Sequence, residues 1–249
     1  MRRLAVLAVI SLAATSAFAQ QKPIKPKSKA EGAAINAMLQ AQDPDSRIKA
    51  ADDLITKYAD TEAKPLALFM EADAYAQKGD PDKAIVYGEQ ALDADPKSYQ
   101  AAVLLCKTYG NITHNNDLDK AEKIAKIDKY GHQGLDILAT AVKPKPDLTD
   151  AEWQTYKDDF SGQIYLGLGI AAVYTNKVDD ANADFQKVAD MDTDPTDLIR
   201  AGRAFLDAKK PDQAIQWFDK AAAHKNANDQ IKKIAASDKT RATAMLPKK

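Results

Sequence analysis

The chain of 249 residues is 45% hydrophobic and 29% charged, the balance of a folded protein with enough apolar surface for a core. Its 35 basic and 36 acidic residues give a formal net charge of -1, which argues against a nucleic-acid-binding protein, because such a protein needs a basic surface to displace counterions from phosphates. Ten glycines and 7% aromatic residues fit an α-rich protein whose close helix contacts rest on alanine.

The first 19 residues have the three parts of a secretory signal peptide. Arg2 and Arg3 supply a positive start, the apolar run LAVLAVISLAA follows, and Ala17-Phe18-Ala19 matches the small-x-small pattern of a cleavage site. Because the run is too short for a comfortable membrane span, we expect cleavage after Ala19 and no integral membrane segment thereafter. The mature protein is then expected in the periplasm or secreted. The alternative is an uncleaved N-terminal membrane anchor.

Residues 20–30 contain four lysines and two prolines with almost nothing to bury, which predicts a flexible basic linker. The chain has one cysteine, Cys106, so no disulfide can form within it and its stability must come from packing. Cys106 lies in the apolar run AAVLLCKTYG at helical spacing, and we expect an inert, buried thiol. The alternative is a reactive or dimer-forming thiol.

Short helical patterns separated by breaks follow from Glu31 onward. A first, irregular helix pair is split at residues 43–46, where a proline disfavours helix before it and Asp or Ser caps the helix that follows. The most regular pair spans Leu68–Pro96. It has a break at Gly79-Asp80-Pro81, and Ala72 and Ala84 lie where its two helices would cross.

Small residues recur at a nearly constant spacing along the chain. Ala72 precedes Cys106 by 34 residues, and Gly169 precedes Gly202 by 33. Each is followed by a second small residue in the next helix, twelve positions on, except that Cys106 precedes its expected partner Ala121 by fifteen. Antiparallel helices approach closely only where neither carries a bulky side chain, so we expect the helices of each pair to cross at these residues.

These patterns resemble the tetratricopeptide repeat family, a helix–turn–helix repeat of about 34 residues. The first-helix motif reads Leu68…Glu71-Ala72…Tyr75 and the second-helix motif reads Ala84…Gly88…Ala91…Pro96, with later copies around Cys106, Gly169 and Gly202. The leading tryptophan is absent, Glu71 replaces an apolar residue and Gly88 replaces an aromatic one. The resemblance covers about residues 31–226. It implies an all-α, right-handed superhelical solenoid of antiparallel helix pairs.

The period breaks between Cys106 and Gly169, where we expect an irregular insertion at about residues 122–160 with a longer central helix pair. Gly131 and Gly134 are expected to loosen or kink its first helix, which ends before Lys143-Pro144-Lys145-Pro146. Thr149 and Glu152 then form a capping-box pattern, which predicts a helix from about 150 to 176. Whether this helix is interrupted at Ser161-Gly162 is left open. The insertion either projects from the array or simply lengthens its core.

Residues 227–249 are expected to form a C-terminal capping helix and tail. A solenoid exposes the apolar face of its last repeat unless another element covers it. Ile231, Ile234 and Ala235 lie on one face of the predicted helix and suit that role.

No residue pattern typical of catalysis or metal binding was found. None of the three histidines has a second ligand at helical spacing: His114, His132 and His224. Asp190 begins a run that resembles a calcium loop, but Pro195 occupies the position where that loop needs glycine. We therefore expect a protein that is not an enzyme and that has no cofactor and no metal.

We expect a scaffold or adaptor of the cell envelope that binds a peptide or helix of another protein through an apolar concave groove. The first helices of repeats in the resembled family line such a groove. Counted from the crossing residues, the groove-facing positions are Phe69, Asp73, Val103, Lys107, Leu166, Ile170, Val173, Ile199, Arg203 and Leu206. The alternative is that the central or C-terminal helices bury these residues. Two further hypotheses are a self-associating structural protein, hence a homo-oligomer, and an uncharacterised enzyme or small-molecule binder.

Overall fold

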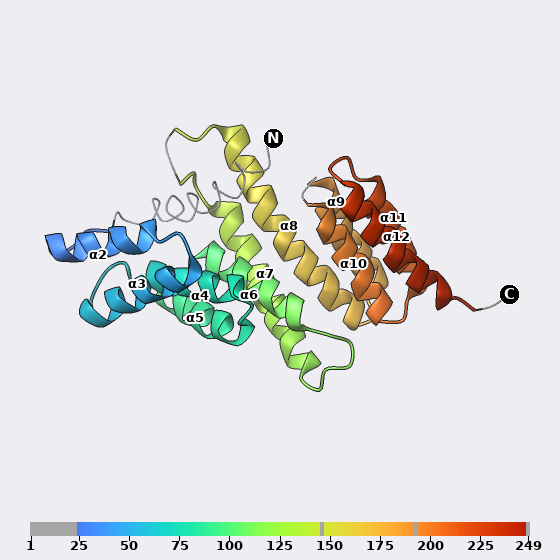
Figure 1. Ribbon diagram of the computed structural model, residues 1–249, viewed down its shortest axis with the longest axis horizontal. Helices are drawn as coiled ribbons and strands as arrows, with labels where there is room; N and C mark the ends of the chain where they lie inside the picture. Colours follow the sequence, from blue (N-terminus) through green and yellow to red (C-terminus); the bar gives the residue numbers. More distant parts are fainter. Residues whose placement is uncertain (1–23, 145–146, 192–193, 248–249) are drawn as a thin grey trace. The chain divides into compact units, whose positions relative to one another are not determined.

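The computed structural model describes residues 24–144, 147–191 and 194–247, and the expected signal peptide at 1–19 lies outside them. Regular structure in this part of the chain is α-helical throughout, which confirms the predicted fold class (Figure 1). The helices are α2 Lys29–Gln40, α3 Pro44–Lys57, α4 Lys64–Gln77, α5 Pro81–Ala94, α6 Tyr99–Ile112, α7 Lys120–Thr140, α8 Asp150–Tyr174, α9 Val178–Asp190, α10 Pro195–Asp207, α11 Pro211–Ala223 and α12 Asp229–Ala244. They form an α-solenoid of helix pairs.

Two compact units make up the chain. The first unit contains the described residues up to Leu105 together with Asp136–Lys157, and the second contains Cys106–Leu135 and the described residues from Asp158 onward. The boundary therefore falls within α6, α7 and α8. The repeat pattern predicts one continuous array over residues 31–226 and does not predict this division.

Local sequence signals determine where the helices begin. Five helices have a proline in their first two positions, where its missing N–H costs no hydrogen bond. Asp43 and Asp80 cap α3 and α5 through their carboxylates. At the start of α8, the Glu152 carboxylate accepts a hydrogen bond from the Thr149 N–H at 2.9 Å, and the Glu152 N–H donates to Thr149 Oγ1 at 3.2 Å. The predicted capping box is confirmed.

Glycines at the helix crossings of the second unit receive aromatic rings. A Cβ built at Gly202 of α10 would lie 2.5 Å from Cε1 of Phe218 on α11, and a Cβ at Gly169 of α8 would clash in the same way with Phe185 of α9. Both phenylalanines are fully buried. The crossing is therefore not a contact of two small residues alone, because one helix supplies the space and the other supplies the ring that fills it.

The crossing at Cys106 differs from the prediction. Ala121, its expected partner, is exposed, whereas a Cβ on Gly131 of α7 or on Gly167 of α8 would lie 3.3 Å or 2.8 Å from the Cys106 sulfur. The buried thiol thus fills the space that two glycines leave. The prediction of Ala121 is wrong because α7, a helix of 21 residues, does not follow the constant repeat spacing.

The central helices are also more regular than predicted. Helix α7 runs through Gly131 and Gly134 as one α-helix, and α8 runs through Ser161 and Gly162. Because a Cβ at Gly131 would lie within 3.3 Å of Leu168 and Cys106, this glycine allows close approach of the helices. Packing thus offsets the low helix propensity of glycine at this position.

Helix α12 caps the second unit, as predicted. Ala235 and Ala242 are buried in the core cluster that includes Phe205 and Phe218, and Ile231 and Ile234 pack against it. Asp238 of α12, whose side chain is only 6% exposed, accepts a hydrogen bond from Arg203 Nε of α10 at 2.6 Å. An apolar contact and a charged contact therefore hold the last helix in place.

We expect Gly202→Ala to destabilise the protein by about 1–3 kcal/mol, because the new methyl group overpacks the site that holds the Phe218 ring. Urea denaturation followed by circular dichroism measures this loss. Gly32→Ala in α2 is the matched control, since the nearest atom to its new Cβ, in Pro26, is 3.4 Å away. This control should be neutral or stabilised by up to about 1 kcal/mol. Equal losses in the two variants would contradict the overpacking explanation.

Candidate functional site

The seven apolar residues among the ten predicted groove positions are buried. Their exposed fractions lie between 1% and 9%, for Phe69, Val103, Leu166, Ile170, Val173, Ile199 and Leu206. Five of them belong to the core cluster of the second unit together with Phe205 and Phe218. In this conformation they serve the core, and a partner that used them would have to displace the helices packed on them.

The three polar residues among those ten positions interact with other side chains of the chain. Arg47 Nη1 of α3 lies 3.3 Å from an oxygen of Asp73. Arg203 is held by Asp238, and Lys107 interacts electrostatically with Asp197. Counting from a crossing residue does not reveal which neighbouring helix packs on these positions.

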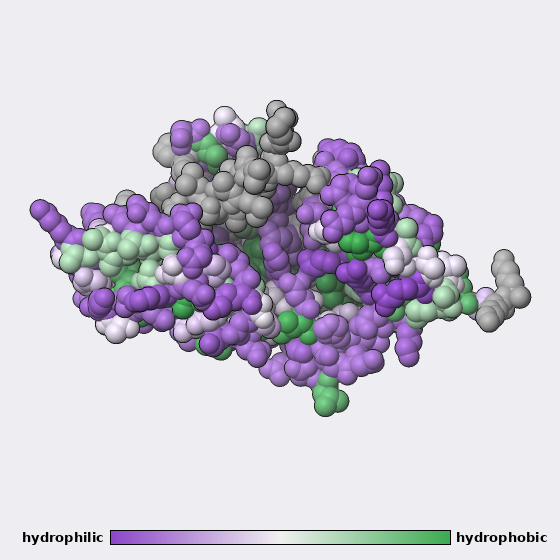
Figure 2. Space-filling view, viewed as in Figure 1, coloured by the Kyte–Doolittle hydropathy of each residue, from purple (hydrophilic) through white to green (hydrophobic). Residues whose placement is uncertain are grey.

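The described surface has few large hydrophobic side chains. On the face shown in Figure 2, hydrophilic residues predominate and hydrophobic ones form small, separate patches. The exposed large hydrophobic residues among the described ones lie on different elements: Val86, Leu118, Val142 and Met245. Single exposed hydrophobic residues are ordinary on a protein surface. A pocket lined by both apolar and polar groups is therefore a better candidate for a binding site than these isolated residues.

Such a pocket lies within the second unit, between α7, α8 and α9, and we call it the α7–α9 groove. Its volume is about 520 Å³, within the roughly 300–1,000 Å³ typical of ligand sites. The lining residues come from one stripe on each helix: Ile124, Asp128, His132 and Leu135 of α7; Tyr165, Leu168, Ala171 and Ala172 of α8, with Thr175 and Lys177 following it; and Asp180, Ala183, Asp184 and Lys187 of α9.

The groove is lined by both apolar and charged residues. Lys187 Nζ lies 4.2 Å from the centre of the Tyr165 ring and 3.0 Å from an Asp184 oxygen, so this cation is held by a ring and a carboxylate. His132 is oriented by its Nδ1, which lies 2.8 Å from the Asp128 carbonyl oxygen of its own helix. These contacts fix side chains around the groove but do not form a base–nucleophile pair.

Metal ligands are not gathered in this region. Among the residues that the structure describes, no group of three or more His, Cys, Asp or Glu side chains could hold a metal ion. The same residues include no helix that is both long and apolar enough to cross a membrane.

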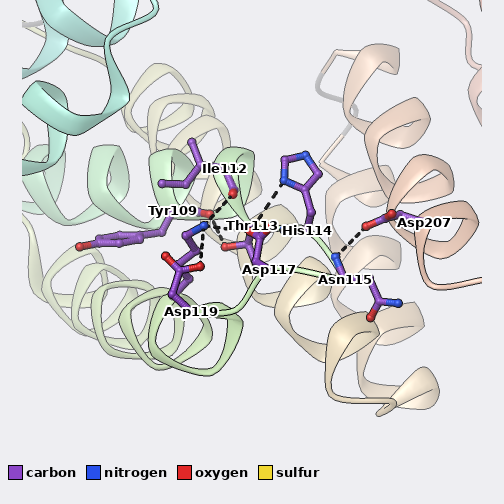
Figure 3. A network of polar contacts seen from close by, with 9 residues as sticks. Tyr109, Ile112, Thr113, His114, Asn115, Asp117, Asp119 and Asp207 are labelled. Carbon is purple, nitrogen blue, oxygen red and sulfur yellow. Dashed lines mark hydrogen bonds and ion pairs between the residues drawn. The ribbon is translucent and has the colours of Figure 1, made fainter.

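A second polar feature is the loop between α6 and α7, whose contacts are drawn in Figure 3. The Asp117 carboxylate accepts hydrogen bonds from the His114 N–H and from Lys123 Nζ, each at 2.9 Å. The Asn115 N–H donates to the Asp207 carboxylate of α10 at 2.8 Å. The loop is thus bound both to α7, which follows it in the chain, and to α10.

Ion pairs between Lys123 and two aspartates also stabilise this loop. Lys123 Nζ also lies 2.9 Å from Asp119, and the two carboxylates raise the pKa of the Lys123 ammonium. The Lys123 side chain, followed by the His114 N–H, lowers the pKa of Asp117. Because its folded pKa is depressed, Asp117 contributes stability at neutral pH that is lost as the pH falls through that value. The His114 imidazole is exposed, with its Nδ1 3.8 Å from an Asp117 oxygen, so His114 contributes to the network mainly through its backbone N–H.

The sequence does not predict the α7–α9 groove. Its polar residues are ordinary surface residues of three amphipathic helices, and only the pairing of those helices brings their stripes together. The available signal was the break in repeat spacing between Cys106 and Gly169, which marked the region as irregular.

Comparison with known proteins identifies two repeat segments. Family profiles described as the tetratricopeptide repeat match residues 65–98, which cover α4 and α5, and residues 166–230, which extend from α8 to the start of α12. Among solved structures, the chain is similar to a thermophilic TPR protein of Thermus thermophilus, with 16% identity, a TM-score of 0.47, and coverage of 78% of this chain and 90% of that chain. A search of curated proteins finds no match.

We expect Lys123→Met to loosen the α6–α7 loop, because it removes the cation that joins Asp117 and Asp119. Amide hydrogen exchange of His114 should accelerate, since its N–H donates to Asp117. Asp119→Asn is the control, because it leaves the Lys123–Asp117 pair in place, and it should have the smaller effect. Unchanged exchange in Lys123→Met would show that the loop is held by other contacts.

Proposed function

We propose, from the premise that this chain is a member of the tetratricopeptide repeat family, that it is a scaffold for protein–protein contacts without a catalytic role. Tetratricopeptide repeats suggest protein partners. The finer proposal is that a peptide segment of another protein binds in the α7–α9 groove, rather than on the buried positions counted from the repeat motif.

The observation that carries this proposal is the composition of the groove. Leu168, Ala171 and Ala172 line it but are at most 8% exposed, so the groove offers a peptide mainly its polar side chains. Asp128 on α7 and Asp180 on α9 line the groove from two different helices and would pair with basic residues or peptide N–H groups. A segment that carries basic residues fits this arrangement best.

We also propose that the protein acts in the cell envelope after export. The support is the charged start, short apolar run and Ala17-Phe18-Ala19 pattern of the first 19 residues. The single cysteine is consistent with an oxidising compartment, because one buried thiol cannot form a mispaired bridge within the chain.

Site-specific photocrosslinking in cells tests the groove. A photoreactive amino acid at Ala183, an exposed groove residue, should capture a defined partner. The same group at Ala125, which is exposed on α7 but does not line the groove, is the control and should not capture it. Identical products from both positions would contradict groove binding.

The same proposal predicts that Ala183→Arg abolishes the Ala183-dependent interaction, because a long cation would fill the groove. To measure this, the partner identified by crosslinking is titrated with the purified variant, and we expect at least a tenfold loss of affinity. Ala125→Arg, which adds the same charge outside the groove, should bind like the original protein. A loss of equal size in both variants would indicate a general charge effect.

Export predicts that the mature protein begins at Gln20. N-terminal sequencing of the protein from the envelope fraction measures this directly. A protein recovered from the cytoplasm with Met1 retained would overturn the export proposal and leave the groove proposal standing.

A further inference from the structure

Lys187 of α9 lines the α7–α9 groove and places its ammonium group against both an aromatic ring and a carboxylate. Its Nζ is 4.2 Å from the centre of the Tyr165 ring of α8 and 3.0 Å from an oxygen of Asp184. All three residues belong to the groove lining. A ring face and a carboxylate both attract a cationic side chain. The groove therefore contains a cation site, and a lysine of the chain itself occupies it.

The ring and the carboxylate are placed more firmly than the cation between them. The Asp184 side chain is 18% exposed, and Tyr165 packs against the core cluster of the second unit. By contrast, the Lys187 side chain is 47% exposed and carries its charge on a flexible four-carbon stem. Exposed ion pairs of this kind are weak, so Lys187 can turn into solvent without disturbing the core. The cation site would then remain in place for a ligand.

The charge of the lining favours a cation as that ligand. Asp128 of α7 and Asp180 of α9 also line the groove, so its carboxylates outnumber its lysines, which are Lys177 and Lys187. An arginine side chain competes best with a resident lysine. Its planar guanidinium stacks on an aromatic ring and forms paired hydrogen bonds with a carboxylate, whereas an ammonium is a compact, strongly hydrated charge.

We propose that the α7–α9 groove recognises an arginine side chain of the partner segment, which binds the Tyr165 ring and the Asp184 carboxylate in place of Lys187. This inference rests on the proposed function and adds the identity of the recognised residue. Lys187 is then an internal competitor, because each arginine that binds must displace it. Removal of Lys187 should strengthen binding, whereas removal of a lysine that contacts a carboxylate of the partner would weaken it.

Nuclear magnetic resonance of the full chain locates the site with a synthetic probe, the peptide Gly-Arg-Gly-Arg-Gly. We expect this peptide to shift the ring signals of Tyr165. The same peptide with citrulline, which keeps the shape of arginine without its charge, should leave them unshifted at equal concentration. Equal shifts with both peptides would overturn the proposal. Shifts at Ala183 without any at Tyr165 would overturn the arginine site and leave peptide binding in the groove standing.

Lys187→Met tests the competition. We expect its affinity for the arginine peptide to rise about two- to fivefold, which corresponds to the removal of one exposed cation–π contact. Lys220→Met is the matched control, because Lys220 Nζ also lies over an aromatic ring, 4.0 Å from the centre of Trp217, but does not line the groove. It removes the same charge and should bind like the original protein. Weaker or unchanged binding in Lys187→Met, or an equal gain in both variants, would overturn the proposal.

The crosslinking experiment at Ala183 separates this inference from the proposed function. Capture of a partner at Ala183, combined with a Lys187→Met variant that binds the arginine peptide no better, rejects the arginine site alone. Failure to capture a partner there, combined with stronger peptide binding by Lys187→Met, supports the arginine site and rejects the groove as the contact with a protein partner.

Discussion

Close approach of neighbouring helices is the constraint on which the packing of each unit depends. Where a repeat has glycine at the crossing, as at Gly169 and Gly202, the next helix supplies a phenylalanine that fills the space. The first unit uses the reverse arrangement. Gly88 of α5 stands where the repeat motif has an aromatic residue, and the side chain of Leu105 from α6 packs against it, 3.0 Å from where a Cβ would lie. The same volume is filled by different helices, so the eroded motif still gives a close-packed core.

Small and bulky residues can thus trade places between neighbouring helices, but the repeat motif does not determine the polar contacts between them. The aromatic and small positions set helix separation, but the polar residues between them decide what each contact requires. Asp238 is buried against Arg203 and Arg241 and so joins the last helix to the array through charge. At Glu71, a fully buried acid occupies a position where the repeat motif has an apolar residue. Neighbouring contacts of one array thus depend on different chemistry.

Features that depend on local sequence could be predicted, whereas those that depend on neighbouring helices could not. Proline and aspartate mark the starts of α3 and α5, and Thr149 with Glu152 marks that of α8, because capping involves residues only three apart. The partner of Cys106 and the burial of Leu166 depend on the register of α7 and α8, which no local pattern contains. The α7–α9 groove depends on three helices at once, and the sequence could only mark its region as irregular.

The rate at which the Cys106 thiol is modified can measure how often the second unit opens. The thiol is fully buried beside Gly131 and Gly167, and burial raises its pKa to about 12, so at neutral pH almost no reactive thiolate exists while the helices are closed. A thiol reagent can modify it only during moments when α6, α7 and α8 separate. Because the chain has no other cysteine, the rate of modification in the unaltered protein reports how often that separation occurs.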